Sequence, residues 1–106
     1  MSDPKARLTD SDIVDAELAD WRHDDGTLIA RFRSRRFAAG LDLVNRIGAS
    51  AEAANHHPDI TLTYAAVVVT LSSHDVGGIT SRDIRLARAI SAHAVELGIA
   101  AERSSR

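Results

Sequence analysis

The most constraining feature of this chain is an uninterrupted run of strand-forming residues from position 60 to position 73. The run is mostly β-branched, aromatic or small and contains no glycine or proline, which is typical of a β-strand. In the first half Ile60, Leu62 and Tyr64 stand on even positions, whereas in the second half Val67, Val69 and Leu71 stand on odd positions and share one face. Because side chains alternate along a strand, this change of phase predicts a bulge or a sharp bend near residues 65 and 66.

Two further elements are predicted before residue 34. Thr9 and Asp12 form a capping-box pattern, and the helical spacing that follows predicts a first helix from about residue 10 to residue 20. Asp25-Gly26 is a strong hairpin-turn signal. It joins a half-buried strand over residues 28–33 to a partner strand that begins at residues 21 and 22.

Two longer amphipathic helices are predicted on either side of the strand run. One extends from about residue 35 to residue 54, with Ser34 as its cap and an apolar stripe at three- and four-residue steps. The other begins at a second capping-box pattern, Thr80 to Asp83, and is closed by Gly98.

The predicted order of elements is therefore helix, hairpin, helix, strand and helix. The economical arrangement is an α+β fold in two layers, with three helices packed on one face of an antiparallel sheet of three to four strands. No internal repeat or linker interrupts the chain. We therefore expect residues 1–106 to form one domain, with residues 1–8 and 101–106 as loose termini.

Composition narrows the class of protein. The formal net charge is −2 and the chain has no cysteine, so we expect neither a nucleic-acid nor a membrane partner, and thiolate metal sites and disulfides are excluded. The basic run Arg31–Arg36 is interpreted as a solvated or subunit-facing surface. The polar start is unlike a secretory signal, and we expect a cytoplasmic protein. Because only 4% of residues are aromatic, the core is light and self-association is expected.

Three of the five histidines flank the strand run: His56 and His57 precede it and His74 follows it. Glu52 lies four residues before His56, so the two side chains face the same way if the preceding helix persists. A straight strand would separate His74 from His56 by more than about 50 Å. One pocket can hold both only if the strand bends or a second subunit contributes.

Imidazoles with a carboxylate nearby suit proton transfer, since the unperturbed pKa of histidine lies near physiological pH. Such a set suits loss of water, in which a departing hydroxyl needs an acid and a neighbouring N–H needs a base. Three alternatives stay open on the residues alone. The histidines are solvated loop residues, Asp83 is only a helix cap, or Glu52, His56 and His74 bind zinc, although their spacing matches no standard zinc pattern.

The combined spacing resembles the signature of the pterin-4a-carbinolamine dehydratases. The pattern is Glu52, three residues, His56-His57-Pro58, five residues, Tyr64, nine residues, His74, eight residues and Asp83. The likeness covers about residues 21–97. Departures occur at residues 59 and 60, where a bulky aromatic is common, and at residues 65 and 66, where a polar and a basic residue are often found.

The resemblance implies dehydration of 4a-hydroxytetrahydrobiopterin to quinonoid dihydropterin, in pterin recycling, by an enzyme that needs no metal and no organic cofactor. It implies a homodimer or a homotetramer. His56 and His74 would be general acids, and His57 would position the substrate and share in proton transfer. Glu52 would orient an imidazole, Pro58 would fix the loop, and Asp83 would support the pocket. A non-catalytic protein-binding or assembly module on the same fold is the alternative.

Overall fold

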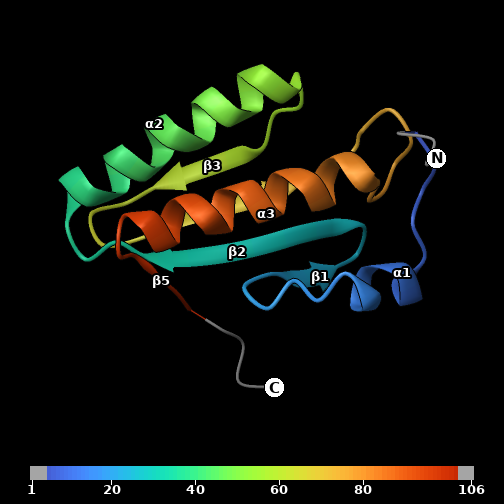
Figure 1. Ribbon diagram of the computed structural model, residues 1–106, viewed down its shortest axis with the longest axis horizontal. Helices are drawn as coiled ribbons and strands as arrows, with labels where there is room; N and C mark the ends of the chain where they lie inside the picture. Colours follow the sequence, from blue (N-terminus) through green and yellow to red (C-terminus); the bar gives the residue numbers. More distant parts are fainter. Residues whose placement is uncertain (1–4, 103–106) are drawn as a thin grey trace.

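The computed structural model describes residues 5–102. Its elements are, in order, α1 (Asp10–Asp15), β1 (Arg22–Asp24), β2 (Thr27–Arg33), α2 (Phe37–Ala54), β3 (Asp59–Leu62), β4 (Val67–Leu71), α3 (Ser81–Glu96) and β5 (Ala100–Glu102). The sheet is antiparallel in the order β1-β2-β4-β3, and β5 also pairs with β2. The long helices α2 and α3 lie side by side across one face of this sheet (Figure 1). The predicted α+β fold is confirmed.

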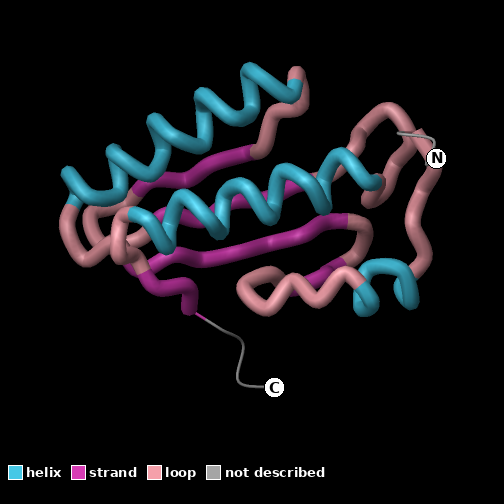
Figure 2. The backbone as a smooth tube through the Cα atoms, viewed as in Figure 1, coloured by secondary structure: helices cyan, strands magenta, loops and turns pink. Residues whose placement is uncertain are grey.

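The sheet has five strands rather than the expected three or four. β1 pairs with residues 27–29 of β2, whereas β5 pairs with residues 31–33. β4 pairs with residues 28–32 of the same strand. Since β4 occupies one edge of β2, the short strands β1 and β5 share the other edge, and five strands fill four positions (Figure 2).

The strand run from residue 60 to residue 73 is two strands, so the expected bulge or bend is a complete reversal. The Thr63 N–H donates to the Ala66 carbonyl at 2.9 Å, and β3 and β4 then pair from Leu62↔Val67 to Asp59↔Thr70. In this register even-numbered residues of β3 face odd-numbered residues of β4, which explains the change of phase. The start of β3 and the end of β4 therefore lie at the same end of the sheet.

The hairpin of β1 and β2 confirms the turn prediction. Asp24 pairs with Thr27, and the two residues between them have positive φ angles, 48° at Asp25 and 78° at Gly26. Both conformations match a type I′ turn, in which glycine is favoured because it has no Cβ.

Helix α1 ends at Asp15, whereas the sequence indicated a helix to about residue 20. Glu17 takes a left-handed conformation with φ 54°, and the chain turns before it reaches Trp21. The Trp21 ring packs edge-on against Phe32, with ring centroids 6.1 Å apart, and its Nε1–H donates to the Ser91 hydroxyl. Trp21 follows the earlier apolar residues at helical spacing, but it enters the core from the turn after α1 and not from a helix.

Helix α2 begins two residues later than expected. Arg36 is its N-cap residue and makes no side-chain cap bond; Ser34 is instead buried, and its hydroxyl has no hydrogen-bond partner among the described residues. Gly40 lets the helix approach the sheet closely. A Cβ at this position would stand 2.8 Å from Leu62 Cδ1 and 3.2 Å from Val67 Cγ2.

Parts of both expected loose termini are ordered. The Leu8 N–H donates to the Ile79 carbonyl at 2.8 Å. Ala101 pairs with Phe32 and Glu102 pairs with Arg31 in β5. Ala101 and Glu102 are held because β2 offers an unpaired edge beyond the end of β1. The rest of the two expected segments, residues 1–4 and 103–106, lies outside the described residues.

The core lies between the sheet and the helices. Phe32, Val67, Val69 and Leu71 contribute from the sheet, and all are fully buried. They pack in one hydrophobic cluster with residues of α2 and α3, including Leu43, Ile47, Ala87 and Ile90. Within residues 5–102, no helix has the length and apolar character needed to cross a membrane.

Candidate active site

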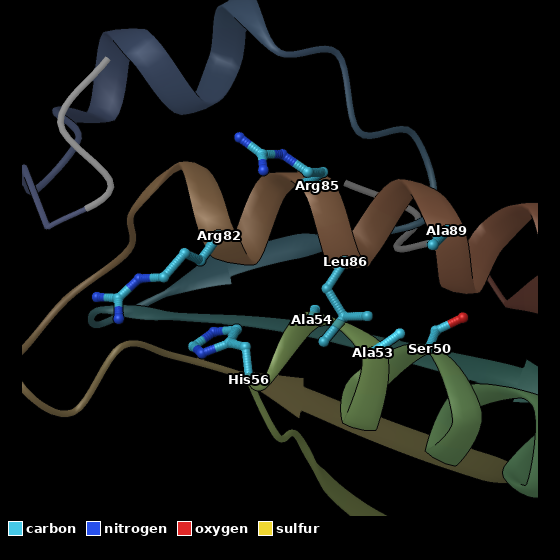
Figure 3. Close-up of a pocket in the computed structure, with 8 residues that line it drawn as sticks. All are labelled: Ser50, Ala53, Ala54, His56, Arg82, Arg85, Leu86 and Ala89. Carbon is cyan, nitrogen blue, oxygen red and sulfur yellow. The ribbon is translucent and has the colours of Figure 1, made fainter.

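His56 reaches the space between α2 and α3 because the chain leaves α2 abruptly. The helix ends at Ala54, and Asn55 follows in the left-handed conformation with φ 50°. The His56 N–H then donates to the Ala51 carbonyl at 3.1 Å, which closes the helix end. The His56 side chain is only 10% exposed, and in Figure 3 its ring lies between the two helices, near Arg82.

A buried carboxylate from the first turn of α3 binds the imidazole. His56 Nε2 and Asp83 Oδ1 are 2.6 Å apart, and the Asp83 side chain is fully buried. An ionised carboxylate removed from water is tolerated only when it is paired and hydrogen-bonded. The pair therefore joins the end of α2 to the start of α3 and fixes one nitrogen of the ring.

Polar groups of the strand end and the α3 cap hold the second oxygen of Asp83. Asp83 Oδ2 accepts from the Ser73 hydroxyl at 2.7 Å and from the Thr80 N–H at 2.9 Å. The latter bond belongs to the capping box of α3. Ser73 and Thr80 are themselves 1% and 0% exposed, and their hydroxyl oxygens are 2.8 Å apart.

A cavity of about 390 Å³ opens beside His56 between the two helices. This volume lies within the range of small-molecule sites in proteins. The small side chains Ala53, Ala54 and Ala89 leave room between the helices, and Figure 3 shows Leu86 pointing into the same space. The lining residues are Ser50, Ala53, Ala54, His56, Arg82, Arg85, Leu86 and Ala89.

Arg82 stands at the His56 end of the cavity and is held by two partners. Its Nε–H donates to the Thr80 hydroxyl at 3.2 Å, and its terminal NH2 donates to Asp75 Oδ1 at 2.8 Å. This second bond holds the pKa of the Asp75 carboxyl below its ordinary value of 3.8. Arg82 therefore adds positive charge beside the imidazole and ties the loop after β4 to α3.

Glu52 pairs with His57 rather than with His56. His57 Nε2 and Glu52 Oε2 are 2.5 Å apart, and the two side chains are 54% and 78% exposed. Glu52 and His56 were expected to face the same way only if the helix continued to His56, and this condition is not met because the left-handed Asn55 ends the helix first. Glu52 therefore contacts the imidazole of His57.

Three other residues of the predicted pattern do not line the cavity, and they differ in exposure. His74 follows Ser73 directly, but its side chain is exposed and does not line the cavity. Pro58 is half-buried in the segment before β3. Tyr64 is 69% exposed in the turn between β3 and β4, at the opposite end of that hairpin from His57.

The zinc grouping considered from sequence is not assembled in this chain, since Glu52 and His56 have different partners. Among residues 5–102, no three His, Cys, Asp or Glu side chains are arranged to hold a metal ion. Ser73 and Arg82 were not predicted from the sequence as residues of the site. The only signal in the sequence was that Ser73 directly precedes His74 and Arg82 directly precedes Asp83. No characteristic spacing identifies a serine hydroxyl or an arginine guanidinium as part of such a site.

Comparison with known proteins identifies the family. The profile described as pterin 4 alpha carbinolamine dehydratase matches residues 6–93. The chain belongs to the pterin-4a-carbinolamine dehydratase family. The resemblance drawn from the pattern between Glu52 and Asp83 is thereby confirmed.

Individual members of the dehydratase family match most of the chain. A protein from Picosynechococcus sp. is 43% identical over 83 residues, which cover 76% of this chain and 90% of the relative. One from Mycobacterium leprae is 42% identical over 85 residues, covering 78% and 90% of the two chains. Both are assigned by name to the pterin-4-alpha-carbinolamine dehydratases.

Two solved structures agree with the observed fold. The crystal structure of a transcriptional coactivator/pterin dehydratase from Brucella melitensis has a TM-score of 0.80 and 31% identity, and the match covers 84% of this chain and 99% of that one. A pterin dehydratase-like RuBisCO assembly factor of the α-carboxysome has a TM-score of 0.58 at 20% identity, over 70% of this chain and 86% of that one. This second likeness shows a shared fold.

Proposed function

We propose that this family member dehydrates a pterin-4a-carbinolamine, 4a-hydroxytetrahydrobiopterin, to the quinonoid dihydropterin in pterin recycling. One observation carries the proposal: a fully buried carboxylate, Asp83, holds the His56 imidazole at the wall of a cavity of about 390 Å³. Burial of a carboxylate–imidazole pair costs desolvation free energy. A module that only binds another protein through its surface has no need for such a pair beside a cavity.

The chemistry required is the loss of water from adjacent carbon and nitrogen atoms. The C4a–O bond breaks, the hydroxyl takes a proton from an imidazolium and departs as water, and a C4a=N bond forms as the ring nitrogen releases its proton. Protonation of the departing hydroxyl is the step most in need of an acid. A positioned general acid contributes about 10²–10⁴-fold to such a step. We assign His56 and His74 as the acids.

The remaining site residues are assigned supporting roles. His57 positions the pterin and shares in proton transfer, and Glu52, which contacts its ring, orients it and stabilises its charge. Pro58 fixes the segment that carries both histidines. Asp83 supports the pocket through His56. His74 lies on the loop directly after Ser73, whose hydroxyl already contacts Asp83, so this loop brings a third imidazole to the same end of the sheet.

The test is a dehydration assay with enzymatically generated carbinolamine, followed by its ultraviolet absorbance. The wild-type protein should accelerate water loss, and His56→Ala should lower the rate by about 10²-fold or more. His23→Ala is the matched control: His23 also pairs with an aspartate, Asp10, but it does not line the cavity. Equal rates for wild type and His56→Ala would refute the proposed site, and loss of rate after chelator treatment would favour a metal.

A protein-binding role is the second candidate, and exposed apolar side chains favour it. Phe37 and Leu41, one turn apart on α2, are 46% and 43% exposed, and Tyr64 is 69% exposed. The related protein from Brucella melitensis is described as a transcriptional coactivator as well as a dehydratase. A protein that binds a partner but leaves the carbinolamine lifetime unchanged would support this candidate against the enzyme.

We also propose that the chain is a homodimer or a homotetramer and that it is cytoplasmic. The same exposed apolar residues of α2 support self-association, since large apolar side chains are stabilised when removed from water. Sedimentation equilibrium should give a mass of two or four chains, and a monomer at micromolar concentration would contradict this assignment. Cell fractionation tests the location.

A further inference from the structure

The hydrogen bonds around Asp83 determine where every proton in this cluster lies. The Thr80 N–H can only donate, and it donates to Asp83 Oδ2 at 2.9 Å. The Ser73 hydroxyl contacts the same oxygen at 2.7 Å. In both contacts Asp83 Oδ2 is the acceptor, and a carboxylate accepts hydrogen bonds but cannot donate them. The single hydroxyl proton of Ser73 must therefore point to Asp83.

The direction of the next bonds follows from that assignment. Because the Ser73 proton is used, the 2.8 Å contact between its oxygen and the Thr80 hydroxyl requires Thr80 to donate. The Thr80 oxygen in turn accepts from the backbone N–H and from the Nε–H of Arg82, each at 3.2 Å. The result is a one-way series of donors from Arg82 through Thr80 and Ser73 to Asp83. Bonds in such a series polarise and strengthen one another.

The contact with Asp83 also determines the tautomer of His56. Asp83 Oδ1 lies 2.6 Å from His56 Nε2, and an ionised carboxylate can only accept, so Nε2 must carry the hydrogen. In the neutral ring the other nitrogen, Nδ1, is then a bare acceptor. Nδ1 is therefore either accessible or hydrogen-bonded, and His56 lines the cavity.

We infer that Ser73 and Thr80 are positioning residues that keep His56 in the Nε2–H tautomer, and that Nδ1 is therefore the atom that exchanges protons with the substrate. This assignment of Nδ1 rests on the proposed function. In the imidazolium, Nδ1–H gives its proton to the departing hydroxyl, the C4a–O bond breaks and water leaves. The pterin nitrogen next to C4a then releases its proton to Nδ1. This restores the imidazolium of His56, and the Nε2–H bond is unchanged throughout.

The wild-type tautomer can be measured without any substrate. Two-bond ¹H–¹⁵N correlation spectra of uniformly ¹⁵N-labelled protein distinguish a protonated from a bare imidazole nitrogen, at a pH where the ring is neutral. The resonances of His56 are assigned by their absence in His56→Ala. A protonated Nε2 and a bare Nδ1 are expected. A protonated Nδ1 with a bare Nε2 would overturn the inference.

Asp83→Asn provides a sharper test of the role of Ser73 and Thr80. Because both residues donate to the Oδ2 position, they select the asparagine carbonyl for that position and turn its NH2 group toward His56 Nε2. Nε2 must then accept, so the tautomer should reverse to Nδ1–H. Asp75→Asn is the matched control, because Asp75 pairs with the other side of Arg82, and the Nε2–H tautomer should persist. Persistence of Nε2–H in Asp83→Asn would overturn the inference.

Ser73→Ala separates positioning from folding. Loss of its hydroxyl removes one donor from Asp83, so we expect both tautomers of His56 to be populated and the dehydration rate to fall about tenfold, a fraction of the full general-acid contribution. Thr80→Ser keeps the hydroxyl series and should retain the wild-type tautomer and rate. A Ser73→Ala protein with a pure Nε2–H tautomer and the wild-type rate would refute the role of Ser73. A wild-type protein with this tautomer but no dehydration would retain the positioning role and refute the proposed function.

Discussion

Replacement of Asp83 by alanine should destabilise the protein far more than removal of an ordinary helix-capping acid. The carboxylate is fully buried and accepts from His56, Ser73 and Thr80 at 2.6, 2.7 and 2.9 Å. Each buried donor left without an acceptor costs about 1–3 kcal/mol. Removal of one partner from a buried pair typically costs about 3–5 kcal/mol, and we expect a loss in that range. Such a loss is a large part of the roughly 5–15 kcal/mol by which domains are stable.

The chain contains a matched control for this prediction. Thr9 and Asp12 form the same capping box at α1, with bonds of 2.9 and 3.1 Å, but both residues are exposed. Urea unfolding followed by circular dichroism should therefore show only a small decrease for Asp12→Ala. A loss for Asp83→Ala no larger than that for Asp12→Ala would refute the argument that burial of the carboxylate determines the difference.

Two further predictions concern helix packing and acid stability. Gly40→Ala should destabilise the protein by about 1 kcal/mol, because overpacking costs about 1–3 kcal/mol and the gain in helix propensity returns at most about 1 kcal/mol. A Cβ at Gly48 in the same helix would meet no atom within 4 Å, so Gly48→Ala should stabilise the protein by up to about 1 kcal/mol. Urea midpoints that move in the same direction for both variants would contradict this pair of predictions. The lowered pKa of Asp75, caused first by its hydrogen bond from Arg82, stabilises the fold above the unfolded value of 3.8, and this contribution is lost as pH falls through the folded pKa. An NMR titration of Arg82→Gln should show the Asp75 pKa rising toward 3.8, and an unchanged value would contradict the assigned cause.

Most of the secondary structure could be predicted because its signals are local. The Asp25-Gly26 turn needs two residues with positive φ, and that requirement is visible in the residue types. The apolar residues of α2 and α3 likewise recur at helical spacing. The reversal between β3 and β4 could not be read in the same way, because its turn over residues 63–66 contains no glycine, proline or asparagine. The change of phase was visible, but a bulge and a reversal produce the same change.

The sequence predicted which residues belong to the site better than it predicted which side chains contact one another. The spacing that ends at Asp83 identified the family, yet the pairing of Glu52 with His57 depended on a left-handed Asn55 that residue spacing does not report. The two Thr-x-x-Asp capping boxes are indistinguishable as sequence. Only the packing of α3 against the sheet and α2 buries the second one and gives Asp83 an imidazole partner.

The most direct test of the account is the position at which a pterin binds. Titration of the ¹⁵N-labelled protein with an unreactive dihydropterin, followed by amide chemical shifts, locates the ligand in a single experiment. We expect the largest shifts at His56 and at residues of the cavity between α2 and α3, such as Ala53 and Leu86. Shifts confined to the exposed apolar face of α2 around Phe37 and Leu41, or no shifts at saturating pterin, would contradict it.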